Sequence, residues 1–189
     1  MSEESMQQPT ERSEESIRSL EGTLTVESVR SVAMTEAAYV FLMRVLHEHA
    51  PHVIRYAFYD MGFRVGEQLM AAYPVGVAGP ERAFRQLVDN YKLMGYGDLE
   101  VVHFDLREPE ARLTGTNLFE TAVAIRSGVY RTPRCVDHYS RGMFAGFLSK
   151  LLDREVVCEE VACQFRGDER CEFVVLPFER SGSAAQERR

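Results

Sequence analysis

The stretch CEEVACQFRGDERCEF, Cys158–Phe173, decides how the C-terminal part of this chain folds. Alternating apolar residues on both sides of a Gly-containing turn predict two antiparallel strands. If the turn is centred on Gly167 with an odd-numbered loop, Cys163 and Cys171 lie directly opposite each other, because each is four residues from the centre. Their sulfur atoms are then expected to meet on one face of the sheet.

Two thiolates in this position can bind zinc, with a carboxylate and a further ligand completing a tetrahedron. Glu160 is the first candidate carboxylate. Strict alternation puts Glu160 on the face opposite Cys163, so it reaches the metal only if a β-bulge or the strand end reorients it, whereas Glu159 lies on the correct face. The alternative to a metal is two reduced cysteines packed across the hairpin, since free cysteines are commonly buried.

The remaining apolar patterns predict three helices, a hairpin, a fourth helix and the final hairpin. This order indicates an α+β fold with a mostly antiparallel four-stranded sheet and about four helices. The expected helices are Val26–His49, His52–Tyr73, Gly79–Gly95 and Thr132–Leu152, and the expected strands are Leu99–Leu106, Ala111–Phe119, Glu155–Phe165 and Cys171–Leu176.

The predicted helix over His52–Tyr73 has two apolar stripes that merge into an arc of roughly 220°, more than one-sided packing needs. It must therefore be covered on two sides, by the core and by a dimer mate or a ligand. We predict a homodimer and a hydrophobic ligand pocket among the helices, because methionine and aromatic side chains give an adaptable apolar lining. The residues predicted to line this pocket are Tyr59, Phe63, Met70, His103, Phe144 and Phe147.

The chain has 189 residues and a formal net charge of -7, which fits one domain and argues against a nucleic-acid partner. We expect a disordered acidic tail over 1–21, a folded ligand-binding domain over 22–178 and a disordered tail over 179–189. The longest apolar run, Ala37–Met43, is too short to span a membrane. Four cysteines without a signal-peptide pattern predict a cytoplasmic protein.

Three segments, RGMFAGFLSKLL from Arg141, EEVACQFRGDERCEF from Glu159 and MGYGDLEV from Met94, together resemble the 4-vinyl reductase domain family. That family is related to the sensor domain of phenol- and toluene-responsive activators and to vesicle-tethering complex subunits. The resemblance covers about Met34–Leu176 and implies an α+β fold, a dimer and a hydrophobic ligand channel. It also implies a zinc site in which Glu160, Cys163 and Cys171 match ligands of the aromatic-sensing members.

One position departs from the family pattern, because the fourth ligand is a cysteine there and Asp137 here. Cys135, two residues earlier, and His138, one residue later, are the alternatives. A carboxylate oxygen binds zinc, so we predict a zinc site of Asp137, Glu160, Cys163 and Cys171 that is weaker than one with three thiolates.

These features predict a sensor or carrier module for a small hydrophobic or aromatic molecule, with zinc as a structural clasp. The family name suggests a second possibility, an enzyme or accessory protein of tetrapyrrole (bacteriochlorophyll) biosynthesis, and the tethering relatives suggest a ligand-free scaffold. No GxGxxG, P-loop, GxSxG or HExxH sequence occurs, so the motifs favour binding over catalysis.

Overall fold

The computed structural model describes residues 17–26, 29–73, 79–108 and 110–179. The chain divides into two compact units, Met1–Ala33 and Met34–Arg189. Most of both predicted disordered tails, residues 1–16 and 180–189, lies outside the described residues.

The first unit contains a small antiparallel sheet of strands β1 (Ile17–Leu20), β2 (Thr23–Val26) and β3 (Val29–Ser31). Strand β1 lies within the segment expected to be a disordered tail, and Val26 ends β2 where a helix was expected to begin. The β-branched residues of this segment favour strands over helix. The first helix instead begins at Glu36, where the Thr35 side chain caps it by accepting a hydrogen bond from the backbone N–H of Ala38.

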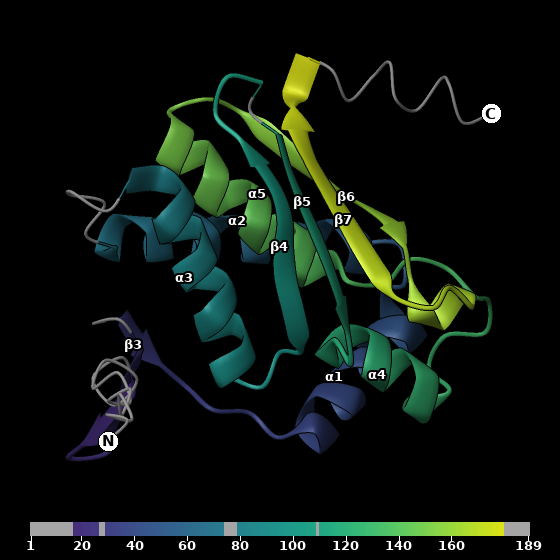
Figure 1. The fold of residues 1–189 in the computed structure, drawn as a ribbon. Coiled ribbons are helices and arrows are strands. Elements are labelled where there is room, and N and C mark those ends of the chain that lie inside the picture. The colour runs from purple at the N-terminus through teal and green to yellow at the C-terminus, as the bar shows by residue number, and fades with distance from the viewer. Residues whose placement is uncertain (1–16, 27–28, 74–78, 109, 180–189) are drawn as a thin grey trace, which may run out of the picture. The chain divides into compact units, whose positions relative to one another are not determined.

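The second unit has an antiparallel sheet with the strand order β4-β5-β7-β6 (Figure 1). Its α+β class and its four strands confirm the prediction, and the described residues form five α-helices where about four were expected. The elements are α1 (Glu36–His49), α2 (Ile54–Ala72), α3 (Gly79–Leu93), β4 (Asp98–Asp105), β5 (Glu110–Thr116), α4 (Phe119–Ser127), α5 (His138–Leu152), β6 (Val156–Ala162), the short 3-10 helix η1 (Gln164–Arg166) and β7 (Cys171–Pro177).

Helix α4 forms in a segment where no helix was expected. We predicted that the strand before it continues to Phe119, but β5 ends at Thr116 and the chain turns at Asn117, which has a φ of 55°. Five successive residues of α4, Glu120 to Ala124, are buried, so the helix lacks the alternation of buried and exposed faces that marks a surface helix. The following helix begins at His138 and not at Thr132.

Helices α2 and α5 cross in close contact because each carries two glycines at the crossing. A Cβ atom at Gly142 or Gly146 of α5 would lie 2.0 Å from a backbone oxygen of α2, that of Tyr59 or Phe63. A Cβ atom at Gly62 or Gly66 of α2 would likewise lie 2.1 or 2.2 Å from a backbone oxygen of α5. Only glycine allows two backbones to approach this closely. The crossing fixes α2 beside the start of α5, where the site described below lies.

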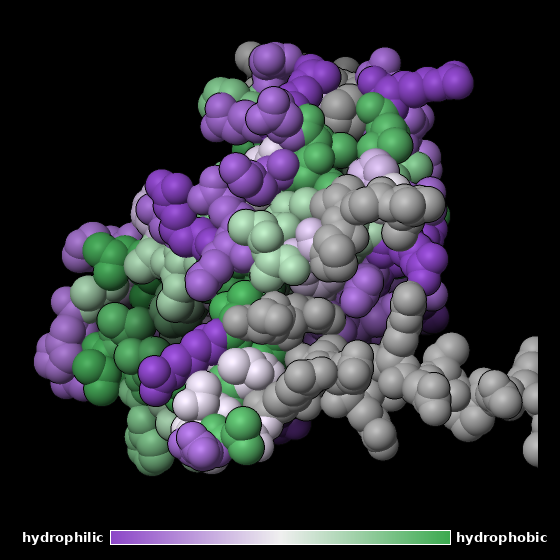
Figure 2. Space-filling view, turned by 90° about the vertical axis from the view of Figure 1, so that its left-hand side faces the viewer, coloured by the Kyte–Doolittle hydropathy of each residue, from purple (hydrophilic) through white to green (hydrophobic). Residues whose placement is uncertain are grey.

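The core lies between the sheet and helices α3 and α5, which pack on it. Phe84, Phe144, Phe147 and Phe173 meet there, and each is 0% exposed. Two apolar side chains of α2 remain open, since Tyr56 is 70% and Met61 47% exposed in the single chain. Apolar residues also reach the surface between hydrophilic ones in Figure 2. No helix in the described part of the chain is long and apolar enough to cross a membrane.

Candidate metal centre

Four side chains predicted as metal ligands come together in the structure. One ligand atom from each of Asp137, Glu160, Cys163 and Cys171 lies within 4.8 Å of all the others, and all four residues are buried. They come from the residue before α5, from β6, from the residue after β6 and from the start of β7. Segments separated in sequence therefore form one compact group of oxygen and sulfur atoms.

A β-bulge places Glu160 in this group. Glu160 pairs with Phe173 and Ala162 pairs with Glu172, so the register shifts at Val161. The extra residue turns Glu160 to the side of Cys163, which strict alternation would not allow. The bulge resolves the conflict left open by the sequence in favour of Glu160, and Glu159 stays outside the group.

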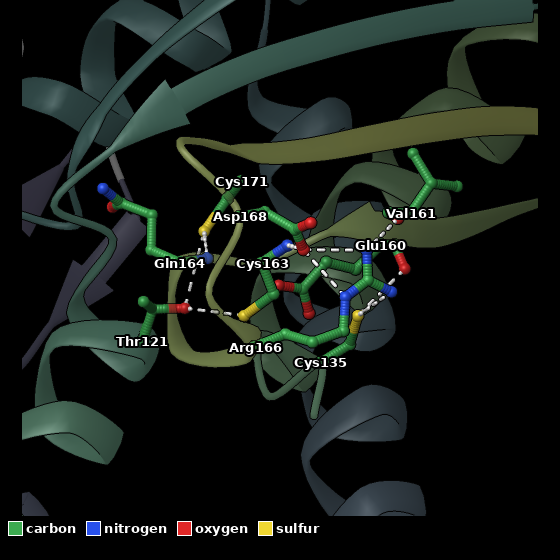
Figure 3. A network of polar contacts seen from close by, with 9 residues as sticks. All are labelled: Thr121, Cys135, Glu160, Val161, Cys163, Gln164, Arg166, Asp168 and Cys171. Atoms are coloured by element: carbon green, nitrogen blue, oxygen red, sulfur yellow. Dashed lines mark hydrogen bonds and ion pairs between the residues drawn. The ribbon is translucent and has the colours of Figure 1, made fainter. Parts of the chain in front are cut away.

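The hairpin loop holds the two cysteines through backbone hydrogen bonds (Figure 3). The N–H of Gln164 donates to the Cys171 sulfur at 3.4 Å, and the N–H of Cys163 donates to the Asp168 carboxylate at 2.8 Å. Gly167 has a φ of 104°, a conformation that favours glycine. Arg166 closes the loop by donating to Asp168 and to the carbonyl oxygen of Val161.

Thr121 of α4 is part of the site and was not identified from the sequence. Its hydroxyl donates to Asp137 at 2.7 Å, and its backbone N–H donates to the other Asp137 oxygen at 3.1 Å. The same hydroxyl lies 3.4 Å from the Cys163 sulfur and 3.6 Å from the Cys171 sulfur. Thr121 thus orients one carboxylate and contacts both thiols. The only sequence signal was polar residues inside the apolar run LFETAVAI.

Glu120, beside Thr121, binds the start of α5. Its carboxylate accepts the backbone N–H groups of Tyr139 and Ser140 and the Ser140 hydroxyl, each at 3.0 Å. The pKa of Glu120 is raised to about 8, mainly by burial and secondly by repulsion from Asp137, although these hydrogen bonds act in the opposite direction. Two adjacent residues of α4 therefore fix the helix terminus that carries Asp137.

The four side chains cannot all lose their protons unless a cation compensates their charges. The pKa of Glu160 is raised to about 12, mainly by burial and secondly by repulsion from Asp137. Burial also raises the pKa of Asp137, to about 6. Hydrogen bonding with Cys135 and Cys171 lowers the pKa of Cys163 far below its ordinary value, and the contact with Cys163 raises the pKa of Cys171. Negative charge is thus favoured on Cys163 and disfavoured on the neighbouring Glu160 and Cys171.

The donor atoms fit a divalent metal ion. Oε1 of Glu160 is buried and has no hydrogen-bond partner among the described residues, while Oε2 accepts the backbone N–H of Asp137 at 3.0 Å. An unpaired buried carboxylate oxygen is costly unless something coordinates it. Two sulfur and two oxygen donors form a set that zinc accepts. This buried group could hold a metal.

The two alternatives for the fourth ligand lie outside the four-residue group. The Cys135 thiol donates to the carbonyl oxygen of Glu160 at 3.2 Å, so it contacts the edge of the site. His138, the first residue of α5, instead lines a neighbouring cleft. Of the three alternatives, the geometry brings Asp137 into the group.

The six residues predicted to line a ligand pocket do not form one described cavity. Tyr59 lines a surface cleft, Phe63 and Met70 pack in or against the core, and His103 is exposed on β4. Phe144 and Phe147 are fully buried, and both rings contact Phe84. Their role in ligand binding stays a prediction.

Known proteins resemble this chain both in its fold and in the sequence of its C-terminal part. Residues 126–177, which include α5, β6 and β7, match the family model of the vinyl-4-reductase domain, abbreviated V-4-R domain. The resemblance inferred from the sequence is thus confirmed in the part of the chain that contributes all four grouped residues. No curated protein is similar enough to this sequence to count as a match.

Solved structures share the fold at low sequence identity. The phenol-responsive sensory domain of the transcription activator PoxR, crystallised with phenol, matches with a TM-score of 0.78 and 20% identity, covering 91% of this chain and 90% of that one. A vinyl-4-reductase family protein from Methanocaldococcus jannaschii matches with a TM-score of 0.53 and 20% identity over 78% of this chain and 83% of that one. A trafficking protein particle complex subunit 3 from Naegleria fowleri, covalently bound to palmitic acid, has a TM-score of 0.49 and 17% identity over 76% and 91% of the two chains.

Proposed function

We propose that this chain is a cytoplasmic module that senses or carries a small hydrophobic or aromatic molecule. The observation that carries the proposal is the fold shared with a sensory domain crystallised with phenol. Exposed apolar side chains also support the proposal. Phe41 and Val45 of α1 are 63% and 54% exposed, and Tyr56 of α2 is exposed as well. We propose that a second copy of the chain covers part of this surface in a homodimer.

The proposal includes a structural zinc ion held by Asp137, Glu160, Cys163 and Cys171. The supporting observations are the 4.8 Å grouping and the unpaired Glu160 oxygen. A bound zinc would supply four bonds that join the β6–β7 hairpin to the start of α5. Because a chain of this size buries enough surface to fold by itself, losing the metal should loosen the hairpin and leave most of the domain folded.

Native mass spectrometry of freshly purified protein tests the metal, the ligand and the dimer together. We expect one zinc per chain, a dimer mass and a co-purified or added phenol, porphyrin or fatty acid that raises the thermal midpoint. The variants Cys163→Ser and Cys171→Ser should lose zinc, whereas Cys158→Ala, which removes another buried cysteine outside the group, should keep it. Absence of zinc from the unaltered protein contradicts the metal assignment. Absence of any thermal shift contradicts the ligand-binding function.

A ligand-free scaffold is the second possibility, and the packing of the core favours it. Phe84, Phe144 and Phe147 fill the space between α3 and α5 with their own rings, which leave no exposed area. A scaffold of this kind would dimerise and bind zinc without responding to small molecules. The ligand arm of the same mass-spectrometry and thermal-shift experiment separates the two functions.

A further inference from the structure

Three arginine side chains surround one cleft beside the metal centre. The cleft has a volume of about 450 Å³, and Arg55 of α2, Arg134 of the segment before α5 and Arg141 of α5 line it. Among the described residues, none of the three forms an ion pair with a carboxylate. Arg134 instead lies over the ring of Tyr130, and Arg141 donates to the carbonyl oxygen of Cys158. Their charges are therefore not neutralised by partners within the described structure.

Negative charge in the cleft does not balance the arginines. Glu159 and Glu160 are the acidic residues that line it. One carboxylate oxygen of Glu160 is engaged by the backbone N–H of Asp137, and the residue belongs to the metal group. Glu159 alone then faces three guanidinium groups. A positive excess of this kind in a chain of net charge -7 calls for an anion from outside.

Two further features of the cleft favour an anion. Ile54 and Arg55, the first two residues of α2, line it, and the first turn of this 19-residue helix has neither a side-chain cap nor an acidic residue. The positive end of the helix dipole adds to the arginine charges. His138 lines the same cleft, is 7% exposed and has a buried Nδ1 without a hydrogen-bond partner among the described residues.

An apolar cleft adjoins the arginines. A second cleft of about 490 Å³ shares Arg55, Arg141 and Glu159 with the first and is also lined by Tyr56, Tyr59 and one further acidic residue, Asp60. Across both clefts, three arginines therefore face two acidic residues outside the metal group. The Tyr56 ring is open to solvent, and the guanidinium carbon of Arg141 lies 5.4 Å from the centre of the Tyr59 ring. The two clefts together offer a charged end and an aromatic wall.

We propose that this double cleft binds a small organic anion. The arginines would hold its carboxylate or phosphate group, and its apolar body would lie against the tyrosines. Guanidinium groups suit this role because they bind both kinds of anion through two parallel hydrogen bonds. The proposal does not rest on the proposed sensing function.

Isothermal titration calorimetry on the full chain as purified tests the proposal. The probes are benzoate, phenyl phosphate, inorganic phosphate and the neutral benzamide, which has nearly the shape of benzoate. We expect benzoate or phenyl phosphate to bind at least about tenfold more tightly than benzamide, and more weakly as salt screens the charges. The tighter of the two identifies the preferred anionic group. Equal binding of inorganic phosphate and phenyl phosphate would overturn the apolar part of the site.

Variants locate the site. Arg55→Gln should weaken binding of the tighter probe about tenfold, as expected for loss of one charged hydrogen-bond donor. Arg64→Gln is the matched control, because Arg64 lies on the same helix, is exposed and pairs with Glu67 away from the cleft. Arg134→Gln repeats the test should the first variant fold poorly. If no anion binds the unaltered protein, or if both cleft variants bind as well as the control, the proposal is wrong and the arginines serve only to offset the nearby acidic group.

Discussion

The substitution Gly146→Ala tests whether the α2–α5 crossing is as close as the structure indicates. The new Cβ would lie 2.0 Å from the backbone oxygen of Phe63, whereas ordinary contacts begin at 3.4 Å, so the helices must separate by about 1.4 Å. A gap of this size forfeits a large part of the dispersion energy along the crossing. Overpacking costs typically about 1–3 kcal/mol and sometimes more, against a gain of about 1 kcal/mol from replacing glycine in a helix.

Because the atoms that clash belong to two helix backbones and not to a flexible side chain, the cost lies at or above the upper end of this range. After the gain of about 1 kcal/mol, we expect Gly146→Ala to lower the free energy of unfolding by about 2–3 kcal/mol, and the thermal midpoint by roughly 4–12 °C. Urea and thermal denaturation followed by circular dichroism measure both quantities. Gly128→Ala is the control, because its Cβ would meet nothing within 4 Å and only the φ of 63° disfavours alanine, which costs about 1 kcal/mol. If Gly146→Ala is as stable as the unaltered protein, or no less stable than Gly128→Ala, the close crossing is refuted.

Three further predictions concern the metal centre and the core. Thr121→Val removes the hydroxyl that orients Asp137. We expect zinc affinity, measured by competition with a chelator, to fall about tenfold while the fold is retained. An unchanged affinity would exclude this positioning role. In metal-free protein Glu120, with its pKa raised to about 8 above the ordinary 4.5, stabilises the fold fully below about pH 4.5 and loses this contribution as the pH rises through 8. The variant Glu120→Gln should therefore show a flatter fall of unfolding free energy between about pH 5 and 8, and an identical slope in urea titrations would count against the raised pKa. Phe147→Ala leaves a cavity at a fully buried position and should lower the free energy of unfolding by about 3–5 kcal/mol in the same denaturation assay. Phe41→Ala, at an exposed site, is the control and should lower it far less. Similar losses of unfolding free energy in both variants would contradict the packing described.

The sequence identified the final hairpin and its two cysteines because the relevant information is local. Gly167 fits a turn that requires positive φ, and equal spacing on either side brings Cys163 and Cys171 together. The strands β4 and β5 and the helices α2 and α3 were also predicted within a few residues of their ends, since their periodicity is clear. The short helix α4 was missed because it shows no helical alternation. The sheet β1–β2–β3 was missed because Val29 and Val32 also fit the spacing of the helix that follows.

For the metal ligands too, the sequence determined one part of the site and the tertiary structure the other. Two opposed cysteines and an α+β fold around them could be read from the residues alone, because they follow from strand and helix periods. Glu160 and Asp137 entered the ligand set through the resemblance to the 4-vinyl reductase domain family, since strand alternation placed Glu160 on the opposite face. Three features emerge only when the elements pack: Glu160 turns inward at a bulge, Thr121 reaches Asp137 from α4, and Arg55 and Arg141 meet at one cleft. Thr121 and Asp137 are 16 positions apart, and their contact depends on how helices pack on the sheet. No local pattern encodes that packing, because it results from burial of the whole core.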